Sequence, residues 1–269
     1  MKIGINWSSP RRLPVVRALL ANGRASFCEI LIDNFLHCGA EDIASLFPGT
    51  PISFHIMNSQ FIQRDVKELS LLGATLRGLI RNLNPLYVSD HLALFSCEGR
   101  RLPMPMEVDY ARDFALARER VGLWQELLGV PLLIENYPSI LDEGRAQPDF
   151  LGALAKETGA GVLFDLSNAV VANKNCGVPL AAWSDIIRRA HHFHAAGYTL
   201  SDTKPPIVRD SHDAALSPDT LIFLRGALEL MRDPETSSIV VERDGNIEEE
   251  SWSRDLEAVR AEIPWTTAA

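Results

Sequence analysis

The chain has 269 residues, 46% of them hydrophobic, so it is long enough to bury one large core, and we expect a single domain over residues 1–269. Its formal net charge of -9 argues against a phosphate-binding surface, and no nucleic-acid partner is expected. The first residues, MKIGINWSSP, lack the apolar segment of a signal peptide, and no apolar run is long enough to span a bilayer, which predicts a cytoplasmic protein without a membrane partner.

Short aliphatic runs predict buried parallel strands, which in chain order are 2–6, 28–33, 52–56, 86–91, 132–136, 162–166, 191–195 and 239–243. Segments with helical periodicity or strong helix formers lie between them, at 14–23, 64–83, 109–129, 149–159 and 218–233. Eight strand and helix units in a chain of this length predict an α/β fold, the (β/α)8 TIM barrel. A doubly wound open sheet is the alternative, but no G-x-G-x-x-G follows the first strand.

Each predicted strand has a polar residue at its last or next-to-last position, and the eight are Asn6, Asp33, His55, His91, Glu135, Asp165, His194 and Glu242. A barrel of this kind carries its active site at the C-terminal ends of its strands, so these side chains are expected on one rim. The long segment after the seventh strand, YTLSDTKPPIVRDSHDAAL, adds Asp210, His212 and Asp213. A lone histidine is usually structural, and a buried carboxylate must be paired or coordinated. The convergence of both residue types on one rim predicts a metal site.

Many carboxylates and imidazoles around one cavity repel one another unless cations compensate, which favours a multinuclear centre. The spacing suggests one ion held by His55, His91 and Glu135, and a second that shares Glu135 with Asp165, His194 and Glu242. A third, weaker ion falls to Asn168, Asp210 and His212. The four cysteines show no C-x-x-C spacing, so nitrogen and oxygen ligands are expected, which suit Fe, Mn or Zn alike.

Two further carboxylates are expected to support the site. Asp33 either caps the helix around Ala40 or holds a loop, and Asp90 is expected to orient the imidazole of the neighbouring His91.

Several stretches resemble the MbnB proteins of methanobactin biosynthesis: EILIDNFLH, SFHIM, YVSDH, LLIENYPSIL, GAGVLFDLSNA, HFHAAGY, DSHDAAL and VVERD. These proteins belong to a wider family of multinuclear non-haem iron enzymes that oxidatively modify cysteines in ribosomally made peptides. The motifs occur in the same order, from about the first strand to the last helix. The resemblance implies two or three irons in a mixed Fe(II)/Fe(III) state. It places the iron ligands on the rim residues His55, His91, Glu135, Asp165, Asn168, His194, Asp210, His212 and Glu242.

The resemblance also implies an activity and partners. The expected reaction uses O2 to convert a cysteine and its neighbouring amide into an oxazolone and a thioamide. Such a reaction also needs a general base, for which Asp213 and Asp33 are the candidates in the sequence. The expected partners are a small MbnC-like protein, forming a heterodimer, and an MbnA-like precursor peptide as substrate. A closed barrel offers no sheet edge to a leader peptide, which fits recognition by a second subunit. Trp252 and Trp265 are either contacts for that subunit or packed against the barrel.

Three other functions remain open. The same pattern resembles the trinuclear zinc site of endonuclease IV type phosphodiesterases, which activate water for attack on phosphate. Those enzymes carry a histidine where this chain has Asn168, and the acidic charge is a poor match for DNA. A non-catalytic peptide-binding barrel with structural metals is the second alternative, and a sugar isomerase or epimerase is the third.

Overall fold

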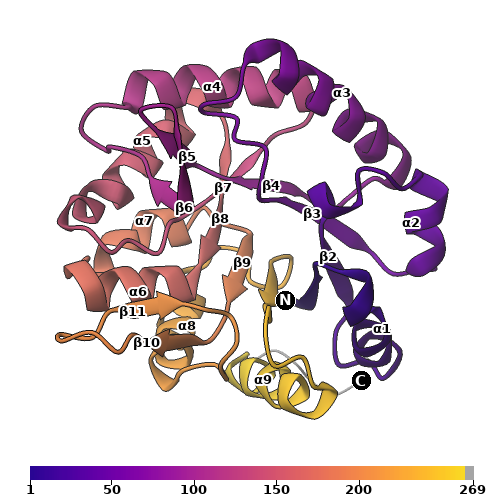
Figure 1. Ribbon diagram of the computed structural model, residues 1–269. Helices are drawn as coiled ribbons and strands as arrows, with labels where there is room; N and C mark the ends of the chain where they lie inside the picture. Colours follow the sequence, from indigo (N-terminus) through magenta and orange to yellow (C-terminus); the bar gives the residue numbers. More distant parts are fainter. Residues whose placement is uncertain (264–269) are drawn as a thin grey trace.

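The computed structural model describes residues 1–263, and within them eight parallel strands close into a barrel (Figure 1). In chain order the barrel strands are β1 (Lys2–Trp7), β2 (Phe27–Leu31), β3 (Ile52–Ile56), β4 (Val88–His91), β7 (Leu133–Glu135), β8 (Gly161–Asp165), β9 (His192–Ala195) and β12 (Ser238–Val241). Neighbours in the chain are neighbours in the barrel, and β12 pairs with β1 to close it. The TIM barrel predicted from the sequence is confirmed.

Helices surround the strands as an outer ring (Figure 1). They are α1 (Leu13–Ala21), α2 (Ala40–Leu46), α3 (Val66–Leu83), α4 (Phe114–Leu128), α5 (Gln147–Thr158), α6 (Leu166–Cys176), α7 (Ser184–Ile187), α8 (Pro218–Leu230) and α9 (Glu249–Glu262). Short 3-10 turns precede or follow several of them: η1 (Pro10–Arg12), η2 (Ile32–Phe35), η3 (Asp142–Ala146) and η4 (Leu180–Trp183). None of the helices between residues 1 and 263 has the length and hydrophobicity needed to cross a membrane.

Residues from alternate strands fill the lower part of the barrel. Phe27, Leu163 and Val240, from β2, β8 and β12, pack with Tyr87, which directly precedes β4. A methyl group at Gly4 would lie 2.4 Å from the Phe27 ring, so the glycine makes room for this layer. Layers contributed by alternate strands are typical of TIM barrels. The apolar layer closes the barrel from below and leaves its C-terminal end for polar side chains.

Two antiparallel ribbons that the sequence did not predict interrupt the strand and helix alternation. One pairs β5 (Ala93–Cys97) with β6 (Arg100–Glu107), and the other pairs β10 (Tyr198–Leu200) with β11 (Val208–Asp210). Figure 1 shows both as separate from the barrel strands, the second in orange beside α6. The strand β6 could not be predicted from the sequence because it contains Pro103 and Pro105, and proline is found in sheets only at edge strands, strand starts and bulges.

Trp252 is not a surface contact. Its side chain is fully buried in α9, and its indole Nε1 donates a hydrogen bond to the Val241 carbonyl over 2.9 Å. The packing alternative is therefore correct for Trp252, whereas Trp265 lies outside the described residues.

Candidate metal centre

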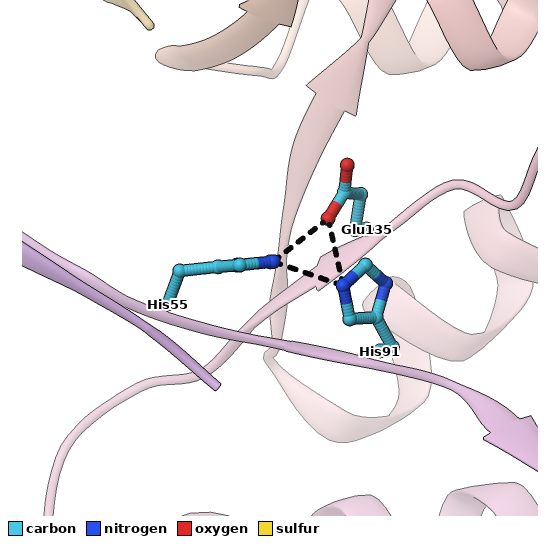
Figure 2. A group of neighbouring side chains, drawn as sticks. All are labelled: His55, His91 and Glu135. Atoms are coloured by element: carbon cyan, nitrogen blue, oxygen red, sulfur yellow. Dashed lines mark hydrogen bonds and ion pairs between the residues drawn. The ribbon is translucent and has the colours of Figure 1, made fainter. Parts of the chain in front are cut away.

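Three side chains converge at the ends of adjacent strands. His55 is the next-to-last residue of β3. His91 and Glu135 are paired in the sheet register and are the last residues of β4 and β7. The Nε2 atoms of the two histidines lie 2.9 Å apart, and each lies 3.4 Å from Oε2 of Glu135. Figure 2 shows the three polar groups pointing toward one another. The Ser89 hydroxyl, 2.8 Å from Nδ1 of His55, fixes the orientation of that ring.

A second group shares Glu135 with the first. Within residues 1–263, the potential ligand atoms of Glu135, Asp165, His194 and Glu242 all lie within 4.8 Å of one another. Nδ1 of His194 lies 3.4 Å from Oε1 of Glu135 and 3.1 Å from Oε2 of Glu242. One oxygen of Glu135 therefore faces each group. The structure brings together the same two sets that the sequence divided between two ions, whereas metal binding itself stays a prediction.

Many polar atoms at this end of the barrel are buried and have no partner among the described residues other than the neighbouring carboxylates and imidazoles of the same cluster. In the part of the chain that the structure describes, such atoms include Glu29 Oε1, Glu135 Oε2, Asp165 Oδ2, Asn168 Oδ1, both ring nitrogens of His194, Asp210 Oδ1, His212 Nε2 and Glu242 Oε2. Buried polar atoms in native proteins almost always have a partner, and an unpaired one costs about 1–3 kcal/mol. So many lone-pair donors aimed into one space fit divalent or trivalent cations bound by nitrogen and oxygen.

The pKa values of the same residues also favour a cation at this place. Burial raises the pKa of Glu135 to about 8 and that of Asp165 to about 7, and it lowers the pKa of His91 to about 3. Without a cation, the two carboxyl groups therefore retain protons near neutral pH, while His91 is neutral. A bound metal would replace those protons, because carboxylates and imidazoles bind metals in their deprotonated forms.

Asn168 joins the centre through the first turn of α6. Asp165 caps this helix, and its Oδ1 accepts a hydrogen bond of 2.7 Å from the Asn168 amide. The side-chain Nδ2 of Asn168 donates to the Asn136 carbonyl over 2.9 Å, which leaves its Oδ1 buried without a partner. Nδ2 also lies 3.4 Å from Oε1 of Glu135, so the amide group of Asn168 lies directly beside the carboxylate that the two groups share.

Asp210 is the last residue of β11, and His212 follows it two residues later. The two side chains form an ion pair. Oδ1 of Asp210 lies 2.7 Å from Nε2 of His212, and Nδ1 of His212 lies 3.6 Å from Oε2 of Glu242. Glu242 therefore connects this pair to the second group. His212 has a positive φ of 50°, a conformation that costs a non-glycine residue about 1–3 kcal/mol and is concentrated at functional sites.

Of the two candidate bases, Asp213 lines the cavity above the centre and accepts a hydrogen bond from the Ser211 hydroxyl. Asp33 was expected at a strand end, which is wrong, because β2 stops at Leu31 and Asp33 lies in η2. Its Oδ2 accepts hydrogen bonds from the backbone amides of Met57 and Asn58, over 3.1 and 2.5 Å. The loop-holding reading of Asp33 therefore agrees with the structure.

Asp90 does not orient an imidazole, contrary to the sequence interpretation. Its Oδ1 accepts from the backbone amide of His91 over 2.7 Å, and its Oδ2 accepts from the indole of Trp124 over 2.8 Å. Asp90 thus connects the end of β4 to helix α4. Only the His91 backbone, and not its ring, is held by this carboxylate.

Sequence reasoning missed Glu29, which lies in the middle of β2 and is 1% exposed. Its Oε1 is 2.9 Å from Nε2 of His194, and its Oε2 accepts a hydrogen bond of 2.7 Å from the Tyr87 hydroxyl. Burial alone would raise the pKa of Glu29, but the His194 imidazole lowers it to about 2. A carboxylate on the far nitrogen of a ligating histidine orients the ring for the metal. The available signal was a glutamate inside an apolar strand.

Tyr87→Phe is expected to destabilise the metal-free protein by about 1–3 kcal/mol, because it leaves a buried oxygen of Glu29 without its donor. Urea unfolding measures the change. The control is Tyr198→Phe, whose hydroxyl bonds Asp219 in a half-exposed pair and should contribute less than about 1 kcal/mol. Equal effects of the two substitutions would contradict the assigned strength of the buried contact.

A cavity of about 420 Å³ lies over the centre. The lining combines polar candidate ligands with the apolar or aromatic side chains of Met57, Met104, Tyr137 and Ile140. Met104 belongs to β6 and Arg209, also in the lining, belongs to β11, so each ribbon forms part of the wall. The volume is in the range of sites for small ligands or single side chains.

The chain is similar in sequence to proteins described as UPF0276 proteins. A UPF0276 protein of Rhizorhabdus wittichii is 28% identical over 232 residues, which cover 82% of this chain and 80% of that protein. A UPF0276 protein of Caulobacter vibrioides is 28% identical over 249 residues, covering 88% and 86%.

Solved structures with the same fold include endonuclease IV from Thermus thermophilus, at a TM-score of 0.57 and 18% identity, covering 97% of this chain and 98% of that one. D-psicose 3-epimerase has a TM-score of 0.58 at 16% identity, covering 97% of both chains. At these identities the likeness shows the barrel alone. The family described as RiPP precursor modification enzyme MbnB/TglH/ChrH, where RiPP denotes a ribosomally made and modified peptide, matches residues 2–262. Since that match takes in nearly the whole chain, this protein belongs to the MbnB/TglH/ChrH family.

Proposed function

We propose that this protein is a multinuclear iron enzyme that uses O2 to oxidise a cysteine of a ribosomally made peptide, with formation of an oxazolone and an adjacent thioamide. We further propose that it acts as a heterodimer with an MbnC-like protein on an MbnA-like precursor peptide. The observation that carries the proposal is the position of Glu135, shared between two ligand groups directly beneath a cavity large enough for a side chain. Membership of a family of peptide-modifying enzymes supports the substrate class.

The residues divide the task of binding iron. His55 and His91 would hold one ion with Glu135, and His194, Asp165 and Glu242 would hold a second with the same glutamate. Asn168, Asp210 and His212 would hold a third. When bound, ferrous and ferric ions supply one-electron chemistry with O2 and favour the thiolate form of the substrate cysteine.

The protein itself positions the peptide and handles protons. The apolar wall around Met57, Met104 and Ile140 would exclude water from the side-chain cavity. Asp213, which also lines the cavity, would accept a proton from the peptide at its carboxylate as the ring closes. The conversion removes four electrons and four protons from the peptide, which one O2 accepts to give two water molecules.

Metal analysis of the chain co-expressed with its partner tests the proposal. Mössbauer spectra of a sample enriched in iron-57 should show two or more irons with coupled ferric and ferrous signals. Incubation with O2 and the precursor peptide should then give the mass change of a four-electron oxidation. Stoichiometric zinc, with no peptide oxidation after iron is restored, would instead support hydrolysis of the endonuclease IV type.

A further inference from the structure

The side chain of Asn175, near the end of α6, pairs with the backbone of β11. Its Nδ2 donates a hydrogen bond to the Val208 carbonyl over 2.9 Å, and its Oδ1 accepts one from the Val208 amide, also over 2.9 Å. An amide side chain that bonds both backbone groups of one residue replaces a neighbouring strand at that position. The outer edge of β11 is therefore fastened to helix α6 at Val208.

This contact joins two elements that carry candidate metal ligands. Asn168 lies in the first turn of α6, and Asn175 lies two turns further along the same helix. On the other side, Val208 begins β11, which ends at Asp210 and leads directly to His212. The distance between Asn168 and the pair of Asp210 and His212 thus depends on how the ribbon sits against the helix.

Other contacts of the ribbon lie at its base and on β10: the His212 carbonyl accepts from the backbone amides of Asp244 and Gly245, and the Lys174 ammonium lies over the Tyr198 ring. The strands of the ribbon are three residues long, and an isolated hairpin of this size is not stable in water. Residues 202–207, between the strands, are all exposed, whereas Val208 is only 6% exposed. At its base the His212 amide donates to the Gly197 carbonyl over 3.1 Å, and on β10 the Tyr198 hydroxyl donates to Asp219. None of these contacts bonds the backbone of β11 to helix α6.

We propose that Asn175 is a positioning residue for the third metal site, because it holds β11 against α6 and so places Asp210 and His212 opposite Asn168. The inference rests on the proposed function, since it requires a third ion. Asn175 itself is not a ligand. Its loss should therefore affect the third ion and leave the ions at Glu135 in place.

The test compares Asn175→Ala with Asn173→Ala in the iron-loaded protein with its partner. Asn173 lies on the same helix, is also half-buried, and donates one hydrogen bond of 2.9 Å to the Val178 carbonyl without contacting β11. Asn175→Ala should lower the iron content by about one ion per chain, and hydrogen exchange at the Val208 amide should become about tenfold faster, as expected when a hydrogen-bonded pair is lost. Asn173→Ala should change neither quantity.

A second variant distinguishes loss of the Val208 contact from a general folding defect. Asn175→Asp keeps the acceptor for the Val208 amide but loses the donor, so an intermediate loss of the third ion is expected. An Asn175→Ala protein with faster exchange at Val208 but an unchanged iron content would overturn the inference and leave the proposed function standing. A wild-type chain that takes up no third ion would overturn the third site of the proposed function, and the inference with it.

Discussion

Glu135→Gln is expected to remove metal from both ligand groups at once. One oxygen of Glu135 lies 3.4 Å from the Nε2 atoms of His55 and His91, and the other lies 3.4 Å from Nδ1 of His194. Glutamine has nearly the same shape but is neutral and offers a single oxygen, so it cannot serve both groups. The loss of metal affinity should exceed the factor of about 10–100 typical of residues that only support a ligand. Elemental analysis measures it, and oxidation of the peptide should become undetectable.

Thermal unfolding gives a second measurement of the same substitution. Metal at about 100 times its Kd stabilises a folded protein by about 2.7 kcal/mol, so a chelator should lower the Tm of the wild-type protein and leave that of Glu135→Gln unchanged. The metal-free forms of the two proteins should differ little in stability near neutral pH, because burial raises the pKa of Glu135 to about 8 and the side chain is then already neutral without a metal. Glu143→Gln, an exposed change in η3, is the control. A Glu135→Gln protein with wild-type metal content would contradict the shared role.

Strand ends were the most informative part of the sequence. A continuous apolar run that stops on a carboxylate or imidazole has few explanations in a parallel barrel, because its C-terminal end is where polar side chains gather. For that reason the two sets around Glu135 could be grouped from the order and spacing of these residues. The prediction of a rim residue requires that the end of the strand is placed correctly. It is wrong where the strand stops before the apolar run does. The run CEILID reads as one strand, but η2 begins at Ile32, which turns Asp33 toward the backbone of Met57 and Asn58.

Residues inside strands and in long connections escaped prediction for other reasons. Glu29 occurs two residues before the end of β2, at the register level of Asn6 and Ser53, and its local signal, a glutamate inside an apolar strand, does not lie at a strand end. The β10 and β11 ribbon has strands too short for a periodic signal, and its position depends on a contact with Asn175. Such pairings are non-local, so they become visible only when the barrel brings α6 and β11 together.

His194→Leu is expected to destabilise the metal-free protein by about 3–5 kcal/mol, the usual cost of removing one partner from a buried ion pair. The imidazole is completely buried, with Nε2 2.9 Å from Glu29 and Nδ1 3.1 Å from Glu242. Burial disfavours its charged form, yet the carboxylates of Glu242, Glu29 and Glu135 raise the pKa of His194 well above its usual value. His194 is thus the cation that balances them when no metal is bound. Urea unfolding measures the loss.

The control and the double variant separate charge from packing. His192→Leu changes a half-buried histidine on the same strand, bonded through Nδ1 to the Ser238 hydroxyl over 2.8 Å, and should cost about 1 kcal/mol. Adding Glu29→Gln to His194→Leu should recover part of the stability, because it removes a carboxylate left without its cation, whereas Glu29→Gln alone should destabilise the protein. Additive effects of the two substitutions would mean that Glu29 and His194 do not interact energetically. In that case the orientation of His194 would have to come from Glu135 and Glu242 alone.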